Sequence, residues 1–420
     1  MKNLRYHTSI PTMRSIHTSS LQTAVFLLSW NKATSLASEV PPYQLTRRTF
    51  STTTFAALNS KSDTNSEMTK NYWNRETSAR QYSSSEPITR EARIICIGNP
   101  NDEANQPVYK GNLPEGAKVL AVGFQQSDFD MKMLKEQKAN VIFTSHPQAR
   151  EPLAQLLTQI PSIEWVHSRS AGLDYITSPV LASSNVLVTN AKGSFSSTLA
   201  EYTMMAIAYF AKDLPRLLKQ KNDKNWEKYS VEEIRCKTLG IVGYGDIGLA
   251  CAKLAKAYGM TVKALRRNPQ NSNDDPFCDE VYANDKASLH RIMRESDYIL
   301  CAAPLTPETK GLFDKEAFDN AKENSVFINV GRGPIVDEDA LISALKNGRL
   351  KGAALDVFAT EPLPTDSELW VLDNVLMSPH NMDQTDTFMH EATEFFVEVN
   401  LPRFMRNEVL LNPVDKVAGY

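Results

Sequence analysis

Hydrophobic and polar positions along the chain fall into segments that match short strands and amphipathic helices. Residues 196–220 (SSTLAEYTMMAIAYFAKDLPRLLKQ) have the spacing of one long amphipathic helix, with Ser and Thr at its start. After this helix, strands and helices alternate densely. Before it, five β-rich runs predict a small parallel sheet; they lie at residues 92–98, 118–123, 140–145, 163–168 and 185–190. The pattern predicts an α/β protein with two sheet-forming regions.

Residues 1–60 have a different composition from the rest of the chain. They hold six Lys and Arg, one acidic residue and many Ser and Thr, which is typical of an organellar transit peptide. The stretch RQYSSS at 80–85 resembles a mitochondrial processing site. We therefore predict a disordered leader over residues 1–90, cleavage near residue 83 and a mitochondrial location, with the plastid as the alternative. The apolar run at 24–30 is too short to span a bilayer, and it leaves a secretory signal peptide as a further alternative.

The net charge and the cysteine pattern argue against several kinds of binding partner. The chain carries a net charge of −3, and residues 1–82 contribute ten basic and four acidic residues, so the remainder carries −9. An acidic body without a basic stripe argues against nucleic acid and anionic membranes as partners. The five cysteines are scattered and include no CxxC pair, which favours reduced thiols and predicts no metal site.

A glycine-rich turn follows the predicted strand at 239–242. Gly243, Gly245 and Gly248 form G-x-G-x-x-G, which permits a tight turn, close approach of a pyrophosphate and packing of the next helix on the strand. Methyltransferases have similar loops, but here a helix and a second strand at 261–265 follow in order, as dinucleotide binding requires. Three further residues of the turn are expected to contact the cofactor: Tyr244, Asp246 and Ile247.

Two arginines stand where an NAD-binding unit normally has an acidic residue. Arg266 lies 18 residues after Gly248, and Arg267 follows it. An acidic residue there binds the ribose hydroxyls of NAD and repels a 2′-phosphate, whereas two guanidinium groups can pair with that phosphate. We predict that the protein prefers NADP and also uses NAD. The alternative is that one arginine is a solvated charge at a strand end and NAD binds through the glycine turn.

Five further motifs occur in a fixed order along the chain. They are SAGLDYI (170–176), PLTPETKGLF (304–313), FINVGRGPIVDEDALISAL (327–345), GAALDVFATEPLP (352–364) and LMSPHN (376–381). Together they resemble the D-isomer-specific 2-hydroxyacid dehydrogenases over residues 92–416. The resemblance implies a Rossmann domain inserted into a smaller, flavodoxin-like α/β substrate domain, and a homodimer formed through the long helix. The implied substrate domain comprises residues 91–195 and 383–420, and the Rossmann domain residues 196–382.

Three residues supply the chemistry that reduction of a 2-oxo acid requires. Arg332, in a Gly-Arg-Gly turn after a predicted strand, can bind and polarise the substrate. His380 ends another strand and is the natural general acid near neutral pH. Glu361 is expected to hydrogen-bond the imidazole and favour its protonated form. Taken singly, each could be an ordinary surface or loop residue; taken as a set they predict catalysis, and the resemblance implies the same roles.

The resemblance also implies contacts to substrate and cofactor. It assigns the substrate carboxylate to the backbone amides at Ala171 and Gly172, together with Arg332. It places Asp356 near the nicotinamide carboxamide, although a turn cap is the alternative for this residue. On the cofactor side it implies Pro304, Thr309, Val330, Gly331, Arg332 and His380.

Several residues depart from the family's usual pattern. Met382 and Asp383 stand after His380 where a small residue is usual, which leaves one wall of the pocket undefined. Cys236 replaces a glycine that commonly precedes KTLG. Pro402 interrupts the predicted C-terminal helix and predicts a kink or break there.

These observations predict an NAD(P)-dependent D-2-hydroxyacid dehydrogenase, an oxidoreductase that transfers hydride between NAD(P)H and a small 2-oxo acid of the glyoxylate or hydroxypyruvate type. Loops around residues 98–112 and 168–175 are expected to set which acid is used. The alternative is a non-enzymatic, dinucleotide-sensing protein on the same scaffold, like the transcriptional corepressors that resemble these enzymes. The transit-like leader and the complete Arg–Glu–His set favour the enzyme.

Overall fold

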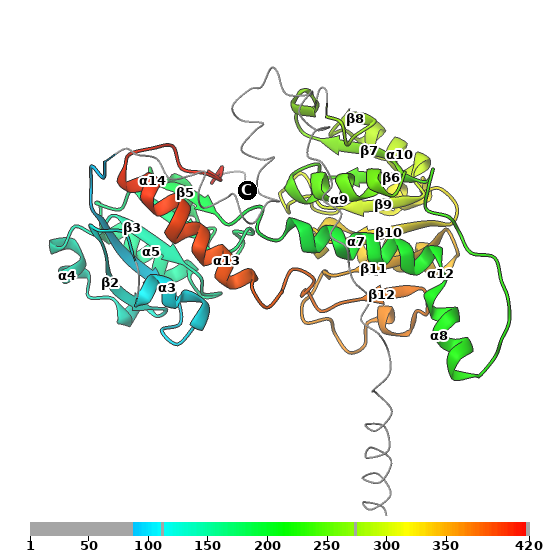
Figure 1. Cartoon of the computed structure of the whole chain (residues 1–420), viewed down its shortest axis with the longest axis horizontal. Helices are drawn as coiled ribbons and strands as arrows, with labels where there is room; N and C mark the ends of the chain where they lie inside the picture. The colour runs from blue at the N-terminus through cyan, green and yellow to red at the C-terminus, as the bar shows by residue number, and fades with distance from the viewer. Residues whose placement is uncertain (1–86, 111–112, 273–274, 417–420) are drawn as a thin grey trace, which may run out of the picture. The chain divides into compact units, whose positions relative to one another are not determined.

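The computed structural model describes residues 87–110, 113–272 and 275–416. Within these residues the chain forms two parallel β-sheets, each covered by helices (Figure 1). Residues 1–86 of the predicted leader, with the apolar run at 24–30 and the processing site at 80–85, lie outside the described residues. Its last four residues are described, and the amides of Thr89 and Arg90 donate to the Met405 carbonyl at 3.0 and 3.1 Å. The expectation of an α/β fold is confirmed.

The first sheet is built from the five strands predicted before the long helix. All neighbouring strands are parallel, and their order is β2-β1-β3-β4-β5, which is the flavodoxin-like order. Apolar side chains are buried on both faces of the sheet, because helices cover both faces. Their bounds are β1 Ala92–Ile97, β2 Ala117–Gly123, β3 Val141–Thr144, β4 Trp165–Ser168 and β5 Leu187–Asn190.

Helices from both ends of the described chain cover this sheet. The C-terminal helical stretch follows the second sheet in sequence, yet Phe396 and Phe404 pack on Trp165 with ring centroids 5.2 Å apart in each pair. Figure 1 shows this stretch, drawn in red, crossing the face of the first sheet. The helices are η1 Glu103–Asn105, α3 Gln106–Tyr109, η2 Gln126–Asp128, α4 Met131–Glu136, α5 Arg150–Gln159, α6 Pro179–Ser183, α13 Phe388–Glu394, η6 Phe395–Asn400 and α14 Leu401–Met405.

At Pro402 we predicted a kink or break; the regular α-helix is interrupted just before this proline, but the chain does not leave the helix. Instead, the π-helical segment η6 links α13 directly to α14, and the Leu401 amide donates to the Phe396 carbonyl five residues earlier. The wider turn accommodates a proline that has no N–H and would crowd the preceding carbonyl in a regular helix. The apolar side chains of this stretch therefore stay on one packed face.

The second sheet has seven parallel strands in the order β12-β11-β10-β9-β6-β7-β8. Counted from β6, this is the Rossmann order with one strand added at the edge, so the predicted dinucleotide-binding fold is confirmed. The boundaries proposed for the two domains stay predictions. The strands are β6 Thr238–Val242, β7 Thr261–Arg266, β8 Glu280–Ala283, β9 Tyr298–Cys301, β10 Ser325–Asn329, β11 Leu350–Leu355 and β12 Val375–Met377.

The predicted helix over residues 196–220 is two helices, so that prediction is wrong. α7 Ser196–Ala211 ends before Asp213, which adopts a left-handed φ of 52° and caps α8 Leu214–Asn222. Pro215 in the first turn of α8 has no N–H to continue the ladder of α7. The remaining helices are α9 Asp246–Ala257, η3 Pro269–Ser272, α10 Lys286–Glu295, α11 Lys315–Asp319, η4 Gly333–Ile335, α12 Glu338–Lys346 and η5 Glu368–Val371.

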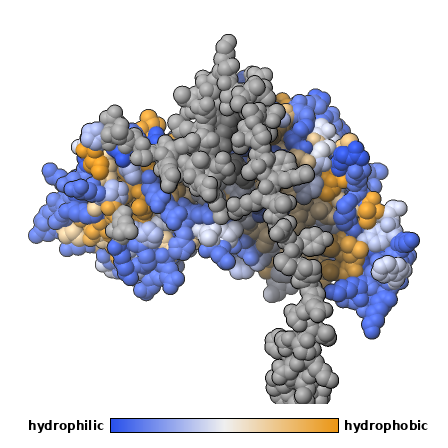
Figure 2. All heavy atoms as spheres, in the orientation of Figure 1, coloured by the Kyte–Doolittle hydropathy of each residue, from blue (hydrophilic) through white to orange (hydrophobic). Residues whose placement is uncertain are grey.

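The surface on the face drawn in Figure 2 is mainly hydrophilic, with apolar residues in small groups. Among the residues that the structure describes, no helix is both long enough and apolar enough to cross a membrane. The same residues contain no cluster of three or more His, Cys, Asp or Glu side chains arranged to hold a metal ion.

Candidate active site

The glycine turn after β6 has the geometry that a dinucleotide requires. Gly243 has a φ of 100°, and a side chain there would overlap the backbone of Ala302 and Ala303. At Gly248, a Cβ would lie 2.6 Å from the Gly243 carbonyl oxygen, so this glycine lets α9 pack closely on the strand. At Gly245 nothing lies within 4 Å of a built Cβ. The backbone at Gly245 is therefore open to a phosphate group.

The N-terminus of α9 faces the same turn. Gly245 is its N-cap residue and provides no side chain, so the first amides of the helix remain available to an anion. Asp246 stands in this first turn, and its carboxylate lies 3.4 Å from Lys192 Nζ. The geometry fits the pyrophosphate of a dinucleotide, and Lys192 is a cation at this end of the helix that sequence reasoning missed.

Arg266 and Arg267 stand at the carboxyl end of β7, as predicted. The Arg266 Nη1 donates to Ser272 Oγ at 2.5 Å, and its guanidinium carbon lies 6.0 Å from the centroid of the buried Tyr244 ring. The Thr306 hydroxyl and, more weakly, the charge of Arg267 lower the pKa of Glu308. The Arg266 guanidinium therefore lies beside the glycine turn, and the charge of Arg267 acts on the loop that follows β9.

Arg332 lies in a turn that its neighbours shape closely. Asn329, the last residue of β10, accepts a hydrogen bond from the Gly331 amide at 3.0 Å and donates to the Arg332 carbonyl at 3.3 Å. A side chain at Gly333 would overlap the backbone at Phe358. The Gly-Arg-Gly sequence is thus required by packing, and it leaves the Arg332 side chain about one third exposed.

The carboxylate loop and Arg332 meet directly, although 160 residues separate Gly172 from Arg332 in the sequence. A side chain at Gly172 would overlap Arg332 Nη2. Asp174, two residues further on, accepts a hydrogen bond from Arg332 Nε at 3.1 Å. Arg332 Nη1 donates to the Gly331 carbonyl at 2.9 Å. The guanidinium therefore rests on the loop of Ala171 and Gly172, as a shared carboxylate site requires.

His380 and Glu361 form the predicted pair. His380 Nδ1 lies 2.8 Å from Glu361 Oε2, and the other carboxylate oxygen accepts the Phe358 amide at 3.0 Å. A carboxylate only accepts, so Nδ1 carries the hydrogen and Nε2 is left for a substrate. His380 has a φ of 52°, in the left-handed region, which is uncommon for residues other than glycine.

Asp356, which follows β11, holds the turn that carries His380. Its Oδ1 accepts the Ser378 hydroxyl at 2.7 Å and the amides of Asn381 and Met382 at 3.1 and 3.3 Å. Burial raises the pKa of Asp356 despite these bonds. These contacts match the alternative we gave for this residue, a turn cap, and they place its carboxyl beside the catalytic turn.

The remaining cofactor-side residues build the loops around this edge of the sheet. Thr309 donates to the Pro304 carbonyl at 2.7 Å and thereby closes the loop after β9. Val330 is buried, and its amide donates to the Cys301 carbonyl at 3.0 Å. Val330 and Gly331 thus connect β10 to the turn of Arg332.

The two residues that depart from the family pattern after His380 are both partly buried. Met382 is partly buried and packs on the apolar core of the second sheet. Asp383 Oδ1 is buried, and no partner among the described residues hydrogen-bonds it. Burial raises the pKa of Asp383, whereas the charges of His380 and Arg332 lower it. Met382 therefore belongs to the core of the second sheet, whereas Asp383 lies close enough to His380 and Arg332 for their charges to act on it.

Comparison with known proteins agrees with this geometry. The sequence profile described as "D-isomer specific 2-hydroxyacid dehydrogenase, NAD binding domain" matches residues 204–381. A glyoxylate/hydroxypyruvate reductase B from Enterobacter sp. (strain 638) is 33% identical over 230 residues, which span 54% of this chain and 70% of the relative.

Two solved structures have the same fold. A D-isomer specific 2-hydroxyacid dehydrogenase from Xanthobacter autotrophicus Py2, in complex with NADPH and MES, superposes with a TM-score of 0.64 at 26% identity and covers 79% of this chain and 100% of its own. An NADPH-dependent glyoxylate/hydroxypyruvate reductase from Sinorhizobium meliloti, in complex with NADP and sulfate, gives a TM-score of 0.63 at 26% identity, with the same coverage.

The fold and the site define an NAD(P)-dependent oxidoreductase that acts on the CH–OH group of its donor. The chain belongs to the D-isomer specific 2-hydroxyacid dehydrogenase family. The predictions of family, of enzymatic function and of NADP or NAD as cofactor are confirmed. The transit peptide, the mitochondrial location and the homodimer stay predictions.

Proposed function

We propose that this enzyme reduces small 2-oxo acids of the glyoxylate and hydroxypyruvate type and prefers NADPH as the reductant. The observation that supports it most is the pairing of Glu361 with His380 at 2.8 Å, while Arg332 rests on the loop of Gly172. Because Glu361 engages Nδ1, Nε2 is the atom from which His380 can give a proton, and Arg332 provides a cation beside two backbone amides.

The residues divide the work of the reduction. The Arg332 guanidinium and the amides of Ala171 and Gly172 bind the substrate carboxylate and polarise the carbonyl. A bound reduced nicotinamide supplies the hydride. His380 Nε2 donates the proton to the developing alkoxide, and Glu361 stabilises the imidazolium through Nδ1. The glycine turn can hold the pyrophosphate of this cofactor, because no atom lies within 4 Å of a Cβ built at Gly245.

Turnover of a panel of 2-oxo acids with NADPH tests this proposal. We expect glyoxylate and hydroxypyruvate to be reduced faster than longer or branched 2-oxo acids. Consumption of NADPH without any 2-oxo acid serves as the blank. No turnover with any acid, despite tight NADPH binding, would favour the dinucleotide-sensing alternative.

Preference for NADPH is supported by the two arginines at the end of β7. Contacts of Arg266 and Arg267 with a 2′-phosphate are expected to favour NADPH by at least about tenfold in kcat/KM, which corresponds to roughly 1.4 kcal/mol. The double change Arg266→Asp, Arg267→Ala should reverse the order. Arg235→Ala, which removes an exposed arginine paired with Glu233, is the matched control and should leave the order unchanged. Equal use of both cofactors by the unmodified enzyme contradicts the preference.

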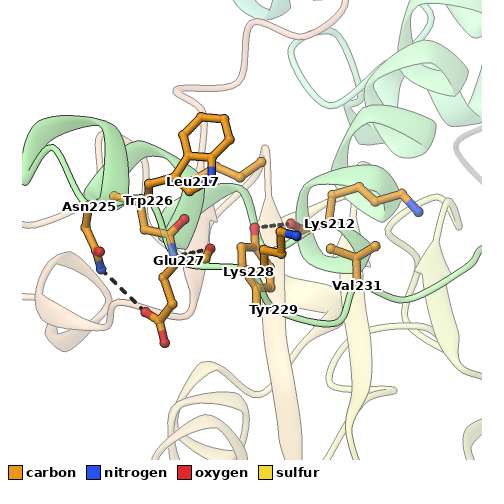
Figure 3. Close-up of a pocket in the computed structure, with 9 residues that line it drawn as sticks. Lys212, Leu217, Asn225, Trp226, Glu227, Lys228, Tyr229 and Val231 are labelled. Atoms are coloured by element: carbon orange, nitrogen blue, oxygen red, sulfur yellow. Dashed lines mark hydrogen bonds between the residues drawn. The ribbon is translucent and has the colours of Figure 1, made fainter.

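A homodimer is the second part of the proposal, and the surface that supports it is on α8. Leu218 on α8 is 53% exposed, and Trp226 in the following segment is 95% exposed. Figure 3 shows Leu217, Trp226 and Tyr229 around a pocket beside this helix. We expected the contact with a second copy along the helix predicted over residues 196–220. Most of α7, the first part of that range, packs within the chain, so we assign the contact to α8, the second part.

Sizing of the protein tests the dimer. Trp226→Glu and Leu218→Glu are expected to convert a dimer at micromolar concentration into a monomer, because a buried unpaired charge strongly disfavours association. Val409→Glu alters a side chain that is 80% exposed and lies outside α8, so it is the matched control. A monomeric unmodified protein would contradict the proposal.

Mitochondrial import is the third part, and it is supported by the composition of residues 1–60. We expect the mature chain to begin near residue 83. N-terminal sequencing of protein isolated from the organelle measures this directly, and an intact Met1 would contradict it.

A further inference from the structure

Two backbone N–H groups in the loop after β4 lack a hydrogen-bond acceptor among the residues that the structure describes. Neither the Ala171 amide nor the Gly172 amide donates a hydrogen bond to any residue that the structure describes. Ala171 and Gly172 are half-buried, so both N–H groups can be reached by water or by a bound acceptor. Whether these two N–H groups can bind one carboxylate depends on the direction in which they point.

The carbonyl groups of the same two peptides are both held by side chains. The Ser168 hydroxyl donates to the Ser170 carbonyl at 2.8 Å. The Asn190 side-chain amide donates to the Ala171 carbonyl at 2.7 Å. Ser168 and Asn190 are almost completely buried, with exposed fractions of 0% and 3%.

The two side chains act from the same side of the loop. Ser168 and Asn190 are register partners at the carboxyl ends of the adjacent parallel strands β4 and β5. Paired residues in neighbouring strands direct their side chains to the same face of the sheet. Ser168 and Asn190 therefore form one polar floor under the loop.

The geometry of the peptide group then determines the direction in which the Ala171 and Gly172 amides point. Both peptides are trans, since the described chain has a cis peptide only at Glu361–Pro362. In a trans peptide the C=O and the N–H of the next residue point in opposite directions. With the carbonyls of Ser170 and Ala171 held against the floor, the amides of Ala171 and Gly172 point away from it.

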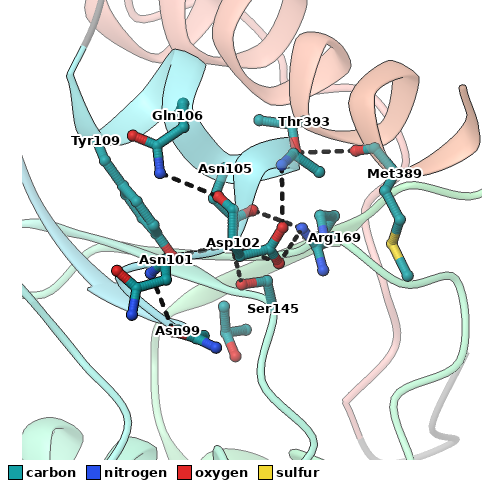
Figure 4. Close-up of polar contacts among 12 residues, drawn as sticks. Asn99, Asn101, Asp102, Asn105, Gln106, Tyr109, Ser145, Arg169, Met389 and Thr393 are labelled. Carbon is teal, nitrogen blue, oxygen red and sulfur yellow. Dashed lines mark hydrogen bonds and ion pairs between the residues drawn. The ribbon is translucent and has the colours of Figure 1, made fainter.

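Arg169 anchors the start of the loop. Its guanidinium is buried and donates from Nη1 to Asp102 at 2.9 Å and to Asn105 at 2.7 Å. Figure 4 shows these three side chains directed toward one another, with Tyr109 and Ser145 bonded to Asn105. This network fixes the chain next to Ser168, so that rotation of the loop as a whole is restrained.

We propose that Ser168 and Asn190 are positioning residues for the substrate carboxylate. They aim the Ala171 and Gly172 amides and thereby set the affinity for a 2-oxo acid. The inference rests on the proposed function, because it takes those amides as the carboxylate site. It adds two side chains that do not themselves touch the substrate.

Steady-state kinetics of Ser168→Ala and Asn190→Ala with glyoxylate and hydroxypyruvate test the proposal. Each variant is expected to raise KM about 10- to 100-fold, the effect of weakening one hydrogen bond to a charged group. The carboxylate is bound alike in the ground state and the transition state, so kcat should change far less than KM. The dissociation constant of NADPH, measured by fluorescence titration, should stay unchanged.

Thr189→Val is the matched control. Thr189 adjoins Asn190 in β5 and is equally buried, but its hydroxyl contacts Trp165 and His167 instead of the loop. This change should reduce stability and leave KM within about twofold. An equal rise of KM in Thr189→Val would show a general structural effect and overturn the proposal.

The outcomes also separate this inference from the proposed function. An active unmodified enzyme with unchanged KM in both variants overturns the positioning role alone. An unmodified enzyme that reduces no 2-oxo acid overturns the proposed function and this inference with it. If Asn190→Ala does not fold, because Asn190 also accepts the Lys192 amide, Ser168→Ala alone decides the matter.

Discussion

Acidification is expected to destabilise the first sheet through one buried histidine, His167. Its side chain has an exposed fraction of 0%, and its ring packs among aromatic rings, including Phe143 and Phe396 with centroids 6.2 and 5.2 Å away. Nδ1 lies 2.7 Å from Thr189 Oγ1, and Nε2 is buried without a partner among the described residues. Burial lowers the pKa of His167 from its usual 6.5 to about 3.

The sign and size of the effect follow from linkage. In the unfolded chain His167 binds a proton below about pH 6.5, whereas in the folded protein it stays neutral until about pH 3. The contribution of His167 to the free energy of unfolding is therefore fully present above about pH 6.5 and is lost as the pH falls below this value. Between about pH 7.5 and about pH 5 the loss is roughly 2 kcal/mol, at about 1.4 kcal/mol per pH unit over some 1.5 units.

Comparison with His167→Phe isolates this contribution. Phenylalanine keeps an aromatic ring in the cluster and cannot take up a proton. We expect urea unfolding to give similar free energies for both proteins at about pH 7.5, and the unmodified protein to lose about 2 kcal/mol more on moving to about pH 5. The other histidines are common to both proteins and cancel. Parallel pH dependences would refute the argument.

Further predictions concern the site and its supports. His380→Ala should reduce kcat by on the order of 10²–10⁴ and leave NADPH binding nearly intact, and Arg332→Ala should reduce kcat/KM at least as much; near-normal turnover of either variant would show that the replaced residue is not part of the mechanism. Cys236→Gly should raise the free energy of unfolding by roughly 0.5–1 kcal/mol, because Cys236 has a φ of 67°; Cys236→Ala should give no gain. Arg169→Met should lower that free energy by roughly 2–4 kcal/mol, because it leaves Asp102 unpaired; an unchanged urea midpoint would contradict this.

Local patterns predicted most of the second sheet and its glycine turn. The roles assigned to Gly243, Gly245 and Gly248 agree with the positive φ, the open backbone and the close helix packing that the structure has. These are properties of a few adjacent residues, so a short sequence motif is enough to specify them. The positive φ of Cys236 likewise explains why glycine is usual there.

The two prolines show where local patterns fail. Pro215 and Pro402 have the same chemistry, yet a new helix begins at Leu214, just before Pro215, whereas the helical stretch continues through Pro402. We expected one continuous helix at the first and a kink or break at the second. The difference lies in packing, because Phe396 and Phe404 hold the C-terminal stretch on Trp165 on both sides of the proline. A proline removes one backbone hydrogen bond, and the tertiary contacts around it determine whether the helix ends there or continues.

The family, the two α/β regions, the dinucleotide turn and the identity of Arg332, Glu361 and His380 could all be predicted from local sequence, because the residues that specify each lie close together in the chain. The partners of these residues follow from the fold. Asn190 reaches the Ala171 carbonyl, and Arg332 reaches Gly172, across separations that no local pattern records. Parallel strands bring their carboxyl ends to one edge irrespective of sequence distance. The direction of each amide and guanidinium there depends on side chains from neighbouring strands.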